Sequence, residues 1–108
     1  MAYDEGLADR IRDCLTGVDG VSERKMFGGL AFMVFGNMAC GPNGDRMIVR
    51  VGPDAYEKCL ALPGASEMTF TGRPMRGFIE LAADSLDDTT LAAWVDRGVA
   101  FASSLPAK

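Results

Sequence analysis

The sequence predicts an α+β fold, a two-layer sandwich in which an antiparallel β-sheet carries its helices on one face. Short apolar segments between residues 24 and 51 are separated by glycine-containing breaks, a pattern typical of a β-meander. Segments with apolar residues three or four apart lie before, between and after the strand segments, as amphipathic helices require. The expected order is one helix, three to four strands, a helix, two strands and a final helix.

The first helix is expected over residues 4–18. Asp4 and Glu5 stand at its start, where carboxylates interact favourably with the positive end of the helix dipole. Gly17 or Gly20 can end it. Its buried stripe follows from the three- and four-residue spacing of Leu7, Ile11, Leu15 and Val18.

The strands of the meander are expected at 24–28, 30–35, 38–41 and 46–51. The segment 30–35 is apolar at every position, which indicates a central strand covered on both faces, or a strand with one face that meets a partner. Asn43 and Gly44 predict a tight turn before the fourth strand. On that strand, the two-residue repeat of the pleat places Arg46 and Arg50 on the same face.

A second helix is expected over 53–62, because Pro53 suits the first turn of a helix and Pro63 ends one. Two further strands are expected at 67–71 and 77–82, with residues 72–76 as the loop between them.

The last helix is expected over 86–103, with Ser85 as its N-cap. Gly98 lies on the apolar stripe of this helix and would allow a close approach to the sheet.

Length and composition fit one domain over residues 1–108, since 48% of the residues are hydrophobic and can form a core. The net charge of −4 disfavours nonspecific binding of nucleic acids. Residues 24–76 nevertheless carry seven basic against four acidic side chains, which keeps a local anion or acidic partner open. An odd number of scattered cysteines, an acidic N-terminus without signal-peptide character and the lack of long apolar runs predict a cytoplasmic protein without a membrane segment.

The residues that usually carry catalysis form no recognisable constellation. Nucleophilic thiols need a base or another means of lowering their pKa, yet the chain has no histidine. The thiols of Cys14, Cys40 and Cys59 are therefore expected to be buried and inert. The glycines match no phosphate-binding motif, and no ligands cluster as a zinc site requires. We expect no enzymatic activity, no catalytic residue, no metal and no cofactor.

Two sets of side chains are candidates for binding. Guanidinium groups can hold carboxylates or phosphates, although exposed charges also serve ion pairing and solubility. The possible partner-binding or anion-binding residues are Arg24, Lys25, Arg46, Arg50, Arg73 and Arg76. Methionine and phenylalanine fill cores but also form adaptable contact surfaces. The possible apolar interface consists of Met33, Phe35, Met38 and Met75.

Four segments, in the same order over nearly the whole chain, resemble the N-terminal domain of TfoX/Sxy proteins. They are RKMFGG at 24–29, MIVRV at 47–51, FTGRPMRGF at 70–78 and LAAWV at 91–95. The resemblance implies an α+β domain with an antiparallel sheet and a link to regulation. Longer relatives carry a second, helical domain and promote natural competence by activating gene expression together with a cyclic-AMP-responsive transcription factor. The resemblance supplies no catalytic residues.

The leading hypothesis is a non-enzymatic regulatory or protein-interaction module, linked to transcriptional regulation. Its strand surface would meet a protein partner or a second copy of the chain. One alternative is a nucleic-acid-binding domain that uses the basic middle of the chain. Another is a small anion-binding protein or enzyme, which requires Arg46, Arg50, Arg73 or Arg76 to converge on a pocket.

Overall fold

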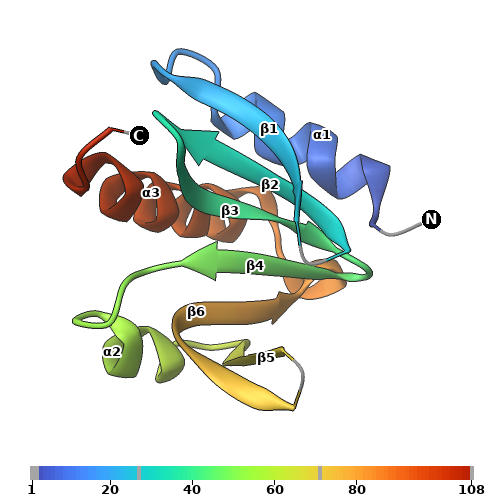
Figure 1. The fold of residues 1–108 in the computed structure, drawn as a ribbon. Helices are drawn as coiled ribbons and strands as arrows, with labels where there is room; N and C mark the ends of the chain where they lie inside the picture. The colour runs from blue at the N-terminus through green and yellow to red at the C-terminus, as the bar shows by residue number, and fades with distance from the viewer. Residues whose placement is uncertain (1–2, 27, 71, 108) are drawn as a thin grey trace.

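The computed structural model describes residues 3–26, 28–70 and 72–107, so Phe27 and Thr71, at the ends of two expected strands, lie outside the described residues. The element order matches the expected α+β order (Figure 1). The elements are α1 (Glu5–Cys14), β1 (Val21–Met26), β2 (Gly29–Val34), β3 (Asn37–Asn43), β4 (Arg46–Arg50), α2 (Tyr56–Leu60), β5 (Ala65–Phe70), β6 (Arg73–Ala82), a short 3-10 helix η1 (Ala83–Ser85) and α3 (Asp88–Ser104).

All six strands form one antiparallel sheet in the order β1-β2-β3-β4-β6-β5. The first four strands are a meander, and β6 then pairs with β4, which leaves β5 at the far edge. Between β2 and β3 the register shifts next to Met33, because Ala39 is an extra residue between the pairs Phe32–Cys40 and Met33–Met38.

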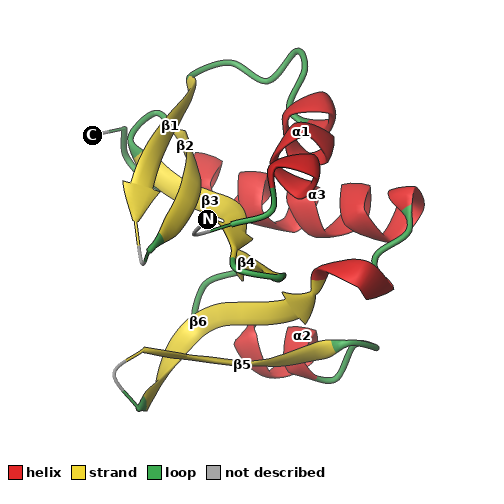
Figure 2. Cartoon of the chain, turned by 90° about the vertical axis from the view of Figure 1, so that its right-hand side faces the viewer, coloured by secondary structure: helices red, strands yellow, loops and turns green. Residues whose placement is uncertain are grey.

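The three helices share one face of the sheet, which confirms the predicted two-layer sandwich. In Figure 2, α1 and α3 lie to the right of the sheet, whereas β1 and β5 end at its left. The main core lies between these helices and the sheet, and α2 joins it through Tyr56 and Cys59. Its largest fully buried side chains include Trp94 from α3, Ile11 from α1, and Phe32, Met47, Ile79 and Leu81 from the sheet.

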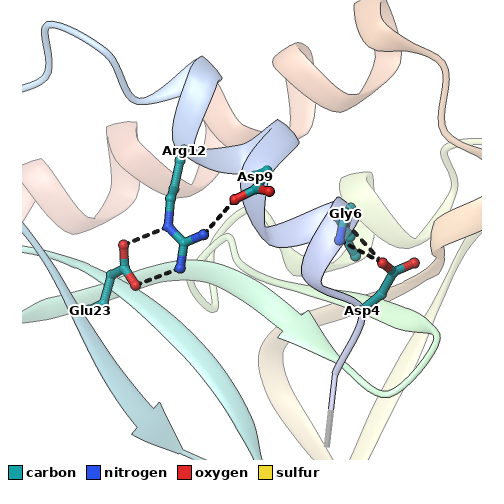
Figure 3. Close-up of polar contacts among 6 residues, drawn as sticks. Asp4, Gly6, Asp9, Arg12 and Glu23 are labelled. Carbon is teal, nitrogen blue, oxygen red and sulfur yellow. Dashed lines mark hydrogen bonds and ion pairs between the residues drawn. The ribbon is translucent and has the colours of Figure 1, made fainter. Parts of the chain in front are cut away.

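Side-chain caps define where the long helices begin. Asp4 accepts hydrogen bonds from the backbone N–H groups of Gly6 (2.8 Å) and Leu7 (3.2 Å), as Figure 3 shows for Gly6. The predicted cap of α3 at Ser85 is wrong, because Ser85 belongs to η1. Asp87 is the cap instead, and it accepts from the Thr90 N–H at 2.7 Å.

Other boundaries also differ from the prediction. The helix α2 covers only Tyr56–Leu60 of the expected 53–62, because Pro53 lies in a turn before it, and β1 begins at Val21 instead of residue 24. Residues 72–76, expected as a loop, mostly belong to β6, where Arg73 pairs with Phe70 and Pro74 with Thr69. Gly72 takes φ 81°, which admits a tight reversal and lets the hairpin continue. The helix α1 ends at Cys14, earlier than expected, and Gly17 follows it with φ 87°.

Gly98 sets the distance between α3 and the sheet. A Cβ at this position would lie 2.4 Å from the carbonyl oxygen of Ala39 and 3.4 Å from a methyl group of Val49. The helix backbone therefore rests directly on β3, as the sequence predicted.

No helix in the described ranges combines the length and the hydropathy needed to cross a bilayer.

Candidate functional site

The face of the sheet that the helices leave open carries a second, smaller core. Its buried side chains are Ala31, Met33, Met38, Ile48 and Met68, and Met26, Met75 and Phe78 pack against them from the flanks. In Figure 2 the sheet curves so that the ends of the β1–β2 and β5–β6 hairpins extend to the same side. This curvature lets the methionines cover one another without a helix layer.

The predicted apolar interface residues therefore do not form one exposed patch. Met33 and Met38 face each other in the β2–β3 register and are only 6% and 4% exposed. Met75 is half-buried. Phe35 differs from the other three, since it is 52% exposed and is the exposed large hydrophobic residue among those described.

Phe35 lies at the tip of the β2–β3 hairpin in an unusual backbone conformation. Phe35 and Gly36 are the two loop residues, with φ 49° and 85°. Positive φ at both positions is typical of a type I′ turn, which normally uses asparagine or glycine. A non-glycine side chain in this left-handed region costs about 1–2 kcal/mol.

The connection between α1 and β1 holds Phe35 in place. The Phe35 N–H donates to the carbonyl of Gly20 at 2.9 Å. The phenyl ring lies over Gly20, because a Cβ on that residue would come within 2.5 Å of the ring carbons. The aromatic ring is thus supported by backbone, while 52% of the residue remains exposed.

The arginines on β4 are engaged in contacts within the chain. The Arg46 guanidinium lies 3.1 Å from the Glu80 carboxylate and 3.8 Å from that of Asp45. The Arg50 guanidinium lies over two aromatic rings, 5.8 Å from the centroid of Phe78 and 5.2 Å from that of Phe101. Arg46 and Arg50 share a face of the sheet but stand at opposite ends of β4.

The other basic candidates are dispersed over the sheet. Arg24 and Lys25 are exposed neighbours on β1, so the pleat directs them to opposite faces. Arg73 and Arg76 are exposed on β6, which β2, β3 and β4 separate from β1. The sheet order thus separates Arg24 and Lys25 from the other four candidates, which lie on the neighbouring strands β4 and β6.

The acidic N-terminal helix is tied to the sheet by an ion-pair cluster. The Arg12 guanidinium binds both carboxylate oxygens of Glu23 at 2.8 Å and one of Asp9 at 2.7 Å (Figure 3). The hydrogen bond from Arg12 lowers the pKa of Glu23. Arg12 also lies over the Phe32 ring, 5.7 Å from its centroid. This cluster fastens α1 to β1.

Cys40 and Cys59 are buried as expected, whereas Cys14 is only half-buried, contrary to the prediction. Burial raises the pKa of Cys40 to about 12. Burial also raises the pKa of the half-buried Cys14, and the nearby carboxylates of Asp96 and Asp13 add to this effect. Cys59 is buried in the main core. Within the described parts of the chain, no three cysteine, aspartate or glutamate side chains come together as a metal site requires.

Sequence reasoning missed a groove on the helix side, between α2 and α3. Its volume is about 540 Å³, and its lining includes Val51, Ala55, Leu62, Ala100 and Phe101, with Lys58 and Arg97 as charged members. A smaller hollow of about 300 Å³ adjoins it and shares Leu62 and Arg97. The available signal was the spacing of Ala93, Arg97 and Ala100 along a second stripe of α3, away from the buried one.

The architecture is that of a two-layer α+β sandwich protein with an open antiparallel sheet. Within this class the chain belongs to the family of TfoX N-terminal domains, whose family model matches residues 13–102. Comparison with curated proteins and with solved structures gave no match. The family assignment confirms the resemblance carried by the strand and helix segments.

Proposed function

We propose that this TfoX-like chain is a non-enzymatic regulatory domain that binds another protein, with Phe35 as the apolar anchor of the interface. The observation that carries the proposal is the half-exposed Phe35 ring in a left-handed turn. Large aromatic side chains dominate the binding energy of protein interfaces. Strained backbone conformations of this kind are common at ligand contacts. A turn with only a structural role would favour glycine or asparagine, which adopt positive φ with less strain.

Charge around Phe35 supports a partner with a basic rim. Asp19 directly precedes Gly20, on which the ring rests. Its carboxylate is exposed and has no ion pair among the described residues. A second copy of the chain would bring the same negative charges together. A different protein, with an apolar pocket bordered by lysine or arginine, fits this surface better.

The same surroundings weigh against the two alternatives. The net charge of −4 disfavours nucleic-acid binding, and Arg46 is already paired with Glu80. An enzyme based on a nucleophilic thiol is disfavoured, because burial keeps Cys40 protonated at neutral pH. An anion site built from Arg46, Arg50, Arg73 or Arg76 is disfavoured because Arg46 is paired with Glu80 and Arg50 lies over the Phe78 and Phe101 rings.

The test compares three proteins in affinity capture from native cells: the wild type, Phe35→Asn and Phe35→Tyr. Asparagine accepts positive φ and removes the aromatic anchor, whereas tyrosine keeps the ring. Candidate partners are then purified and titrated by calorimetry. We expect Phe35→Asn to weaken a specific partner about 30-fold or more, as loss of an interface hot spot does, and Phe35→Tyr to stay close to the wild type.

Equal binding of the partner to wild type and Phe35→Asn would contradict the proposal. So would a self-associating wild type in sizing experiments, since that outcome favours a homodimer. Tight, salt-dependent binding to DNA at low ionic strength would favour the nucleic-acid alternative.

A further inference from the structure

The groove between α2 and α3 exists because the two helices pack on different strands. The short α2 packs against β5 and β6, whereas α3 packs against β2, β3 and β4. Val51, which directly follows β4, lines the space left between them, and α2 contributes the buried Cys59. On the α3 side the lining of the two hollows extends from Thr89 to Phe101, which corresponds to about 18 Å of helix.

The charges lining the groove all have one sign. Lys58 and Arg97 are its charged members, and no acidic side chain lines it among the described residues. The Arg97 guanidinium lies over the Trp94 ring at 4.7 Å from the centroid, so it is oriented by a ring contact and not by a carboxylate. Neither cation has an ion pair within the described part of the chain. The groove therefore combines apolar walls with unneutralised positive charge.

We propose that this groove binds an amphipathic carboxylate, specifically a medium-chain fatty acid. The hydrocarbon tail lies along the apolar walls formed by Val51, Leu62 and Phe101, and the carboxylate is held by Lys58 and Arg97. A volume of about 540 Å³ falls within the range of small-molecule sites. A partner helix of the same length and a diameter of about 10 Å would fill about 1,400 Å³, more than both hollows provide.

The test titrates ¹⁵N-labelled protein with decanoate and follows the backbone amide resonances. We expect saturable shifts at Val51, Ala55, Leu62 and Ala100. Decan-1-ol, which has the same tail without the charge, should bind several-fold more weakly. The double variant Lys58→Gln/Arg97→Gln should lower decanoate affinity by about fivefold or more, since each near-surface charge contributes modestly.

Two further variants make the result specific. Arg24→Gln removes one positive charge from the exposed part of β1 and should leave decanoate binding unchanged. Ala100→Phe fills the groove from an exposed helix position and should weaken binding without unfolding the protein. The proposal is overturned by shifts that do not saturate or that map elsewhere, by equal affinity for decan-1-ol, or by undiminished binding to the double variant. This site is separate from Phe35, so neither outcome depends on the proposed protein partner.

Discussion

Replacing Gly98 by alanine tests how α3 is seated on the sheet. On helix propensity alone, alanine would stabilise the protein by about 1 kcal/mol. The new Cβ, however, would lie 2.4 Å from the Ala39 carbonyl oxygen and 3.0 Å from its carbonyl carbon. Both are backbone atoms, so rotation of a side chain cannot relieve the overlap.

The helix must therefore move away from β3 by most of an ångström. A gap of 0.5–1 Å forfeits about a quarter to a half of each dispersion contact, and overpacking of a core costs about 1–3 kcal/mol. Because the colliding atoms are backbone, we place Gly98→Ala at the upper end of that range. After subtraction of the propensity gain, a net loss of about 2 kcal/mol is expected, which corresponds to a fall in Tm of about 10 °C.

The assay is urea denaturation followed by circular dichroism, supported by thermal scans. Ala93→Gly is the matched control, since Ala93 is an exposed position of the same helix and reports propensity without packing. It should lower the free energy of unfolding by about 1 kcal/mol. A Gly98→Ala protein as stable as the wild type, or more so, would refute the direct contact between α3 and β3.

Three further predictions concern polar groups and thiols. Asn37→Ala removes a buried side-chain hydrogen bond (3.0 Å) to the C-terminal segment and should cost about 1–2 kcal/mol in urea denaturation, whereas an unchanged midpoint would exclude this role. Arg12 lowers the pKa of Glu23 below its ordinary 4.5, so this pair stabilises the fold above that pH and its contribution is lost as the pH falls through the lowered folded value. The difference in Tm between wild type and Glu23→Gln should accordingly shrink only in acid, and a difference that persists unchanged in strong acid would contradict this. Ellman's reagent should modify the half-buried Cys14 before the buried Cys40, and the opposite order would contradict the burial of Cys40.

Local sequence patterns were sufficient to predict the architecture. Each successful prediction depends on contacts that are close in the sequence or between one helix and the sheet beneath it. Examples are the apolar spacing of α1 and α3, the turn at Asn43–Gly44 and the small residue Gly98. The uniformly apolar segment 30–35 was also informative. Its main part, β2, is buried on both faces because Phe32 enters the main core and Met33 the second core.

The features of the candidate sites depend on long-range geometry that the sequence does not report. Whether Met38 is exposed depends on how strongly the sheet curves, and that in turn depends on the Ala39 bulge and on the packing of distant strands. The sequence around Phe35 does not predict its positive φ, because this turn position usually holds asparagine or glycine and here holds phenylalanine. The groove beside Arg97 forms because α2 and α3 pack against different strands, which is a tertiary arrangement that local sequence patterns do not predict.

The central claim is that Phe35 is kept for binding and not for stability. The most direct test measures, on the same Phe35→Gly protein, the free energy of unfolding and the affinity for the partner. Half-burial of the ring contributes about 0.7–1.5 kcal/mol, and glycine relieves strain of about 1–2 kcal/mol, so the two effects nearly cancel. We predict a stability within about 1 kcal/mol of the wild type together with loss of partner binding. A protein destabilised by more than about 3 kcal/mol that still binds its partner would show that Phe35 is structural, and would contradict the account.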